Sequence, residues 1–155
     1  MVTEGTQAPA VTLQDHAGKW RSLSEYKGSW ALLYFYPKDD TPGCTKESCA
    51  LRDDLPQFER LDCAVLGISP DSVESHAAFR EKYDLPFPLL ADPKKEAIRA
   101  YGVWGKKQFM GREYEGVLRT SFLIDPAGYI AKAYRDVKPA SHAEEVLRDL
   151  EVFQK

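Results

Sequence analysis

An unbroken apolar run, Trp30 to Tyr36, places the strongest constraint on how this chain can fold. The run has no alternation between apolar and polar residues, which is typical of a strand covered on both faces. Pro37 ends it, because proline has no backbone N–H to donate to a sheet ladder. A second run of this kind, Cys63 to Ser69, follows a stretch without glycine that favours a helix. Two buried strands separated by a helix predict an α/β fold.

Turn residues between apolar stretches predict two further strand pairs. Val11 to Gln14 and Trp20 to Ser22 flank a short turn, which indicates an N-terminal β-hairpin. Val117 to Ile124 and Tyr129 to Tyr134 enclose Asp125-Pro126-Ala127-Gly128, which indicates an antiparallel pair near the C-terminus. We therefore expect a central mixed β-sheet flanked by helices.

Helix signals lie between these strands. Helices are predicted from about Cys44 to Glu59, from Asp71 or Ser72 onward, from Asp92 to about Tyr101, and from Ser141 to about Phe153. Pro56 is expected to end or kink the first of them, because it removes a helical N–H. Ser141 and Glu144 are expected to form a capping box at the start of the last.

Length, charge and hydropathy exclude several classes of protein. The 155 residues contain no repeat or Gly/Ser linker, which predicts one domain over residues 1–155. The net charge of -3 argues against a nucleic-acid partner. The longest apolar run has seven residues, whereas a membrane-spanning helix needs about 20, so no membrane partner is expected. The first residues lack the basic and apolar regions of an export signal, so we expect a cytoplasmic location.

The number and positions of the cysteines indicate a reactive thiol rather than a structural disulfide. The chain has three cysteines, and an odd, clustered set predicts a catalytic disulfide, if any, rather than a structural one. Cys44 follows a Pro/Gly loop at the start of a predicted helix, where free backbone N–H groups and the helix dipole favour a thiolate. This position is typical of a nucleophilic cysteine. A buried cysteine that happens to lie in a turn has the same local sequence, so the position alone leaves both interpretations open.

The surrounding residues decide between them. Pro37, Thr41 and Cys44 form the pattern P-x-x-x-T-x-x-C, and Thr41 to Glu47 with Cys49 resembles the peroxiredoxin Q (bacterioferritin comigratory protein) subfamily of the peroxiredoxins. Nearly the whole chain shares this resemblance. The other matching segments are Gly5 to Pro9 with Leu13, Val65 to Ser69, Phe87 to Asp92, Tyr101 to Gly105, and Gly116 to Asp125. Ser48 and Leu51 depart from the subfamily, in which Ala and Phe are common.

The resemblance implies a thioredoxin-like fold and a thiol peroxidase that reduces hydrogen peroxide and organic hydroperoxides. Cys44 would attack one peroxide oxygen and become a sulfenic acid. Thr41 would place a hydroxyl beside the thiolate and the substrate, and Pro37 would shield the pocket. Arg119 would hold a positive charge beside the sulfur and orient the peroxide. Glu47, on the same helix face as Cys44, would position the arginine.

The resemblance also implies that Cys49 resolves the sulfenic acid within the same chain. In an intact helix, five residues separate two Cα atoms by about 8 to 9 Å, whereas a disulfide requires at most about 7 Å. The first turns of the helix must therefore unwind on oxidation if this pair forms a disulfide. A thioredoxin-like dithiol protein would then reduce the disulfide. The alternative for Cys49 is a buried helical cysteine without a redox role.

No cofactor or metal is expected. His16, His76 and His142 are scattered, without metal-ligand spacing, and are expected at the surface or in turns, as are the solvated acids Asp39 and Asp40. Cys63 is expected in the core. The chain has no cysteine after Cys63, which argues against a disulfide between subunits, so we expect a monomer, with a weak homodimer as the alternative.

Two other functions remain open from the sequence. A thiol-disulfide oxidoreductase of the same fold requires a C-x-x-C pair, which is absent. A peroxide sensor or redox-switched holdase could use Cys44 and Cys49 in the same way, with slow turnover and a stable oxidised state. The aromatic segment around Trp104, Phe109 and Tyr114 could line the peroxide pocket, cover the mobile helix, contact a partner, or simply pack in the core.

Overall fold

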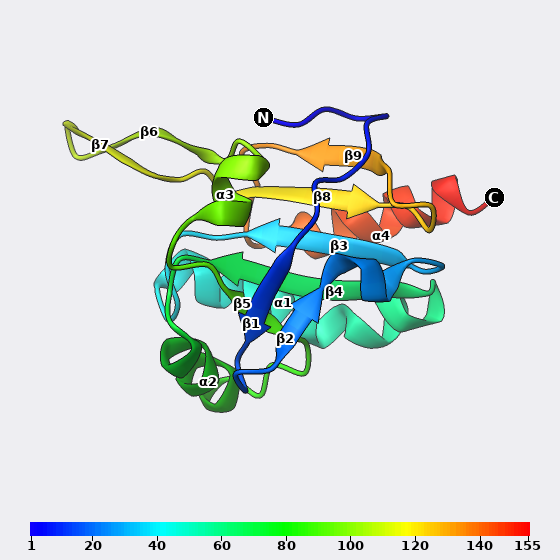
Figure 1. The fold of residues 1–155 in the computed structure, drawn as a ribbon, viewed down its shortest axis with the longest axis horizontal. Helices are drawn as coiled ribbons and strands as arrows, with labels where there is room; N and C mark the ends of the chain where they lie inside the picture. Colours follow the sequence, from blue (N-terminus) through cyan, green and yellow to red (C-terminus); the bar gives the residue numbers. More distant parts are fainter.

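A seven-stranded mixed sheet forms the centre of the computed structural model, which describes residues 1–155 (Figure 1). Its strands are β1 (Thr12–Asp15), β2 (Trp20–Ser22), β3 (Trp30–Phe35), β4 (Cys63–Ser69), β5 (Leu89–Ala91), β8 (Thr120–Ile124) and β9 (Ile130–Tyr134). They lie in the order β2-β1-β5-β4-β3-β8-β9. The neighbours β3, β4 and β5 are parallel, and the remaining pairs are antiparallel. The predicted N-terminal hairpin and the C-terminal strand pair are both confirmed.

Strand β3 is buried on both faces, as its apolar sequence predicts. Leu32 and Tyr34 belong to one core cluster, and Leu33 and Phe35 belong to the cluster on the other side of the sheet. Alternate side chains of a strand point to opposite faces, so an unbroken apolar run can contribute to two cores at once. This strand thereby packs against the layers on both sides of the sheet.

Helices cover both faces of the sheet. They are α1 (Pro42–Arg60), α2 (Val73–Lys82), α3 (Glu96–Ala100) and α4 (His142–Phe153), with a short 3-10 helix η1 (Leu23–Tyr26). Side chains of α1, α2 and α4 fill the first core cluster, and those of α3 fill the second. Helices α1 and α4 lie together on the far side of the sheet (Figure 1). None of the helices combines the length and the apolar character required to cross a membrane.

Two predictions about where helices begin or end were wrong. Helix α1 continues through Pro56 to Arg60, because Phe58 is fully buried and its burial helps to compensate for the missing helical hydrogen bond. Helix α3 begins at Glu96, because the Asp92 carboxylate accepts the N–H groups of Glu96 and Ile98 from outside the helix.

The capping box of α4 is absent. Ser141 makes no side-chain cap bond, although it is the residue that precedes the helix. The neighbouring His142 instead lies between Ser121 Oγ, 2.8 Å from Nε2, and Glu145 Oε1, 3.3 Å from Nδ1. Helix α4 is therefore fixed at its start by a buried side chain rather than by Ser141.

The sequence did not reveal a second, two-stranded sheet formed by β6 (Trp104–Phe109) and β7 (Arg112–Val117). This hairpin projects from the end of the main sheet where β3 ends and β8 begins (Figure 1). Its two-residue turn has positive φ at Met110 and Gly111, as a type I′ turn requires. The strand predicted over residues 117–124 is therefore interrupted at Leu118 and Arg119, which frees Arg119 from the ladder.

Candidate active site

The loop between β3 and α1 places Cys44 in the first turn of a helix. The N–H of Tyr36 donates to the carbonyl of Ile68 at 3.0 Å, and Pro37 then ends the strand. Helix α1 starts at Pro42, whose fixed φ suits a first helical position. The first hydrogen bond of the helix runs from the N–H of Thr45 to the carbonyl of Thr41 at 2.8 Å. The N–H groups at the start of α1 are therefore oriented toward the space around Cys44.

Cys44, Arg119 and Glu47 form one connected group. The Arg119 Nη2 group donates to Cys44 Sγ at 3.2 Å, and its Nη1 group donates to Glu47 Oε1 at 2.9 Å. Cys44 and Glu47 are each 1% exposed, so both hydrogen bonds are largely shielded from solvent. A planar guanidinium can make both bonds at once because its donors form a rigid fork. The structure thus brings together residues separated by 75 positions in the sequence.

Burial dominates the electrostatics of this group. It raises the pKa of Glu47 to about 7, although the charge and the hydrogen bond of Arg119 act in the opposite direction. The second oxygen of Glu47, Oε2, is buried without a hydrogen-bond partner, as expected for a carboxyl that holds a proton readily. Burial opposes the charge on Arg119, but Cys44 and Glu47 outweigh it and raise the pKa of the guanidinium.

Glu47→Gln should remove a pH dependence of stability. The ordinary pKa of the Glu47 carboxyl is 4.5, whereas in the folded protein it is about 7. Because the folded form binds this proton more tightly, the carboxyl contributes stability that is complete below about pH 4.5 and is lost as the pH rises through 7. The pKa difference corresponds to about 3 kcal/mol of unfolding free energy. Urea unfolding at pH 5 and pH 8 measures this loss.

The comparison is best made in the Cys44→Ser background, which removes titration of the thiol. The exposed Glu59, on the same helix, gives a matched control as Glu59→Gln and should leave the pH dependence as it was. An undiminished loss of stability between pH 5 and pH 8 in the Glu47→Gln protein would show that another group is responsible.

Thr41 and Gly43 shape the approach to the sulfur. The Thr41 hydroxyl donates to the carbonyl of Lys38 at 2.9 Å, so its oxygen remains free to accept a hydrogen bond from a substrate. Gly43 leaves room for the arginine, because a Cβ at this position would lie 3.1 Å from Arg119 Nη2. Pro37 is half-buried where β3 passes into the loop. The structure therefore places all of the predicted site residues around α1 and the end of the sheet.

Cys49 lies in the same helix as Cys44 but on a different face. Helix α1 is continuous from Pro42 to Arg60, and both thiols are free. Cys49 is half-buried beside a shallow hollow that is also lined by Asp40, Thr45 and Tyr83. In this conformation the Cα atoms of the two cysteines are about 8 to 9 Å apart by helix geometry, which is beyond the range of a disulfide.

Comparison with known proteins identifies the family. The sequence model of the AhpC/TSA family matches residues 5–133 of the chain. The chain belongs to the AhpC/TSA family. Its relatives include Peroxiredoxin Bcp of Bacillus subtilis (strain 168), 46% identical over 146 residues, with 94% of this chain and 93% of the relative covered. Peroxiredoxin Bcp of Escherichia coli (strain K12) is 43% identical over 143 residues, with 92% of each chain covered.

Solved structures agree with this assignment. Peroxiredoxin Q of Xanthomonas campestris has a TM-score of 0.88 and 39% identity, with 94% of this chain and 92% of that chain covered. A second structure comes from a study of the alkyl peroxide reduction activity of Xanthomonas campestris bacterioferritin comigratory protein. It has a TM-score of 0.91 and 36% identity, with 99% of this chain and 100% of that chain covered. The chain thus has the thioredoxin-like fold of the peroxiredoxins and is a thiol peroxidase of the oxidoreductase class.

A buried hydrogen bond attaches helix α1 of this peroxiredoxin to the sheet. The hydroxyl groups of Ser48 and Tyr34 lie 3.0 Å apart, and both residues are fully buried. Leu51, one turn further, is also fully buried in the core cluster of this face. The two positions that depart from the subfamily pattern are therefore packing positions, and one of them adds a polar contact between the reactive helix and β3.

The structure corrects the expected positions of two histidines and one acid. His76 and His142 are buried, and Asp39 is only 7% exposed. The Asp39 carboxylate lies 2.7 Å from His76 Nδ1 and accepts the hydroxyl of Tyr36 at 2.6 Å. Asp40 is exposed, as expected, and pairs with Lys82 at 2.8 Å. No local pattern indicates the Asp39–His76 contact, because it joins residues from a loop and from α2.

Asp39, Asp71 and His76 have donor atoms close enough to hold a metal ion. The structure uses these atoms for hydrogen bonds instead. His76 Nε2 faces the carbonyl of Leu90 at 3.0 Å, and Asp71 accepts the N–H of Asp39 at 2.8 Å. The cluster therefore anchors the loop that precedes α1 of the peroxiredoxin.

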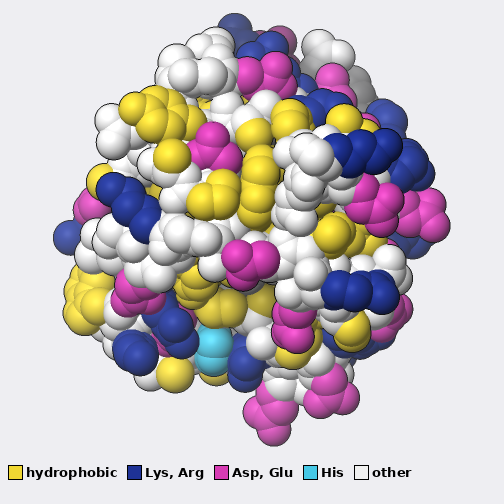
Figure 2. All heavy atoms as spheres, turned by 90° about the vertical axis from the view of Figure 1, so that its right-hand side faces the viewer, with side chains coloured by type: hydrophobic (Ala, Val, Ile, Leu, Met, Phe, Trp, Pro, Cys, Tyr) yellow, Lys and Arg dark blue, Asp and Glu magenta, His cyan; other side chains and the backbone are white.

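Cys63 and the largest hollow lie apart from this chemistry. Cys63 is 3% exposed at the start of β4, and burial raises the pKa of its thiol to about 12, which keeps it protonated. The hollow, about 470 Å³, is lined by the N-terminal segment, η1 and the β8–β9 turn and contains no cysteine. The end of the molecule opposite the hairpin has charges of both signs interspersed with apolar groups (Figure 2).

Proposed function

We propose that this peroxiredoxin reduces hydrogen peroxide and organic hydroperoxides with Cys44 as the peroxidatic residue. The observation that carries the proposal is the buried Cys44 sulfur at the start of α1, with Arg119 Nη2 donating to it at 3.2 Å. The thiolate attacks one peroxide oxygen, the O–O bond breaks, and the second oxygen leaves as water or an alcohol after taking up a proton. Cys44 becomes a sulfenic acid.

The surrounding groups support this step in distinct ways. Arg119 and the N–H groups of the first turn stabilise the charge that develops on the leaving oxygen. The Thr41 oxygen, with its hydrogen committed to Lys38, accepts the peroxide O–H and so aligns the O–O bond with the sulfur. Glu47 holds Arg119 in place, and Pro37 closes the loop side of the pocket. Neither metal nor organic cofactor takes part in this step.

Cys49 then resolves the sulfenic acid. Its sulfur attacks that of Cys44, water leaves, and an intrachain disulfide forms. Because the two residues are too far apart in an intact helix, the first turns of α1 unwind in each cycle, and the Ser48–Tyr34 hydrogen bond breaks. A thioredoxin-like dithiol protein reduces the disulfide, and α1 reforms. Since both cysteines belong to one helix, we propose that the chain works as a monomer, in the reducing cytoplasm.

A coupled assay tests the proposal. Thioredoxin, thioredoxin reductase, NADPH and hydrogen peroxide are mixed with the wild-type protein, and NADPH consumption is followed. We expect turnover that requires thioredoxin, together with an intrachain Cys44–Cys49 disulfide detected by mass spectrometry after peroxide treatment. The Cys44→Ser protein is the blank. Persistent NADPH consumption in that variant would refute the assignment of Cys44.

A further inference from the structure

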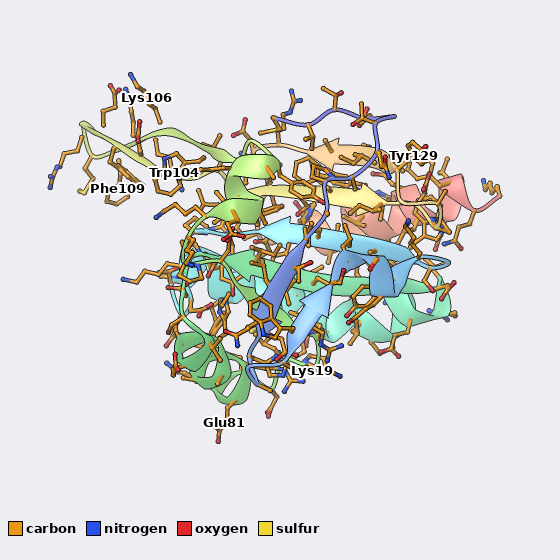
Figure 3. All side chains as sticks on the ribbon, viewed as in Figure 1. Lys19, Glu81, Trp104, Lys106, Phe109 and Tyr129 are labelled. Carbon is orange, nitrogen blue, oxygen red and sulfur yellow. The ribbon has the colours of Figure 1, made fainter.

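The two faces of the β6–β7 hairpin have different chemistry. On one face, Lys106 pairs with Glu113 at 3.2 Å, and Trp104 Nε1 donates to Glu115 at 3.3 Å. The strand register places Lys107 opposite Tyr114 on the other face. Lys106 and Phe109 lie on opposite sides of the hairpin (Figure 3). Because Lys107 is two residues from Phe109, it shares the Phe109 side and has no acidic partner there.

Lys107 folds back toward the base of the hairpin instead of extending into solvent. Its Nζ donates to the carbonyl of Val117 at 2.9 Å, and Val117 is two residues before Arg119. Gly116 provides the space, because a Cβ there would lie 3.3 Å from Lys107 Cδ. Lys107 is half-buried, whereas Lys106 is exposed. The ammonium is thus held beside the segment that carries the arginine of the active site.

Above about pH 7, the active site without Lys107 has fewer positive than negative charges. The Glu47 carboxyl, whose pKa is about 7, is then ionised, and together with a Cys44 thiolate it carries two negative charges. Arg119, which contacts both, carries one positive charge. The Lys107 ammonium is bound to the carbonyl of Val117, two residues before the arginine that contacts Cys44. Burial and the charge of Arg119 lower its pKa, and the charge of Cys44 opposes this change. A second cation at this place makes the group electrically balanced.

We propose that Lys107 is a positioning residue for the peroxidatic cysteine, acting through its charge on Cys44. The ammonium favours the thiolate and offsets the negative charge that the thiolate and Glu47 place around the leaving oxygen. Two of its three N–H donors remain after the bond to Val117, so it can also bind water at the pocket. This inference rests on the proposed role of Cys44 and extends the site to a hairpin that lies outside the main sheet.

Lys107→Gln tests the proposal, because glutamine keeps a donor for the Val117 carbonyl and removes the charge. In the Cys49→Ser background, alkylation of Cys44 by iodoacetamide is followed from pH 5 to pH 10, with the modified site located by mass spectrometry. We expect the midpoint of the profile to rise by about 0.5 to 1 pH unit, as for the loss of one nearby charge in a partly solvated site. Single-turnover peroxide reduction at pH 7 should slow by about 3- to 10-fold.

Two variants complete the test. Lys106→Gln removes the neighbouring charge on the opposite face and should leave both measurements unchanged, whereas Lys107→Arg should restore them. A Lys107→Gln profile that superimposes on the parent profile would overturn the proposal, as would an equal shift from Lys106→Gln. Alkylation needs no peroxide. A parent protein that fails to reduce peroxide would therefore refute the peroxidase proposal, separately from the link between Lys107 and Cys44.

Discussion

Arg119→Ala is expected to slow the reaction of Cys44 with hydrogen peroxide by about 100- to 1000-fold, the range found when one charge-stabilising donor is removed from an active site. Ionisation alone cannot account for such a loss. A thiol with an ordinary pKa of ~8.5 is already about 3% ionised at pH 7, so complete ionisation gains at most ~30-fold. A less basic thiolate is also a weaker nucleophile, which reduces that gain. The larger part of the effect therefore comes from the position and charge of the guanidinium.

Stopped-flow measurement of the single-turnover rate at pH 7 and pH 10 separates the two contributions. The deficit should persist at pH 10, above the ordinary pKa of a thiol. Arg148→Ala, at an exposed position of α4, is the matched control and should retain the wild-type rate. The single-turnover rate of Arg119→Lys should lie between the rates of Arg119→Ala and the wild type. A lysine keeps the charge but lacks the rigid fork that bridges Cys44 and Glu47. Recovery of the wild-type rate by Arg119→Ala at high pH would reduce the role of Arg119 to thiol ionisation.

Cys49→Ser should limit the protein to a single turnover with peroxide. The variant should consume about one equivalent of peroxide and then stop, because the Cys44 sulfenic acid is buried and no intrachain thiol remains to attack it. With thioredoxin as the reductant, NADPH consumption should end after this first turnover. The Cys63→Ser protein is the control, since Cys63 is a core thiol, and it should continue to turn over.

The same variant tests the unwinding of α1. One equivalent of peroxide should lower the helical circular dichroism signal of the wild-type protein, because its disulfide cannot form in an intact helix. The Cys49→Ser protein should keep its signal, and a mass increase of one oxygen should appear on Cys44. Undiminished turnover in Cys49→Ser would make this cysteine a bystander and would place resolution with an external thiol.

Local sequence patterns predicted the parts of the fold that depend on neighbouring residues. The apolar run from Trp30 to Tyr36 indicated a strand buried on both faces, and alternate residues of β3 do fill two cores. Ser72 was expected near the start of a helix, and its side chain accepts the N–H of Ser75 at 3.1 Å. The Pro56 and Ser141 predictions failed, because the burial of Phe58 and of His142 outweighed a local preference.

Only some of the long-range contacts within the site could be predicted from the sequence. The resemblance to the peroxiredoxins named Cys44, Arg119 and Glu47 together, because their motifs occur together in that family. The residues that surround them gave no such signal. His76 has no partner in its own segment, and its contact with Asp39 joins residues 37 positions apart. Lys107 belongs to a hairpin that the sequence did not reveal, because Met110-Gly111 is not a strong turn signal.

The sequence by itself determined the reactive unit: a strand ended by Pro37, a loop, and a helix that starts just before Cys44 and carries Cys49 five residues later. These features depend on backbone preferences and on helix periodicity, which are local properties. Only the tertiary structure decided the charges around the sulfur. The break at Leu118 and Arg119 turns the guanidinium toward Cys44, burial raises the pKa of Glu47 to about 7, and Lys107 returns to the base of its hairpin. Coulomb interactions and burial depend on distances in space, and those distances exist only after the chain has folded.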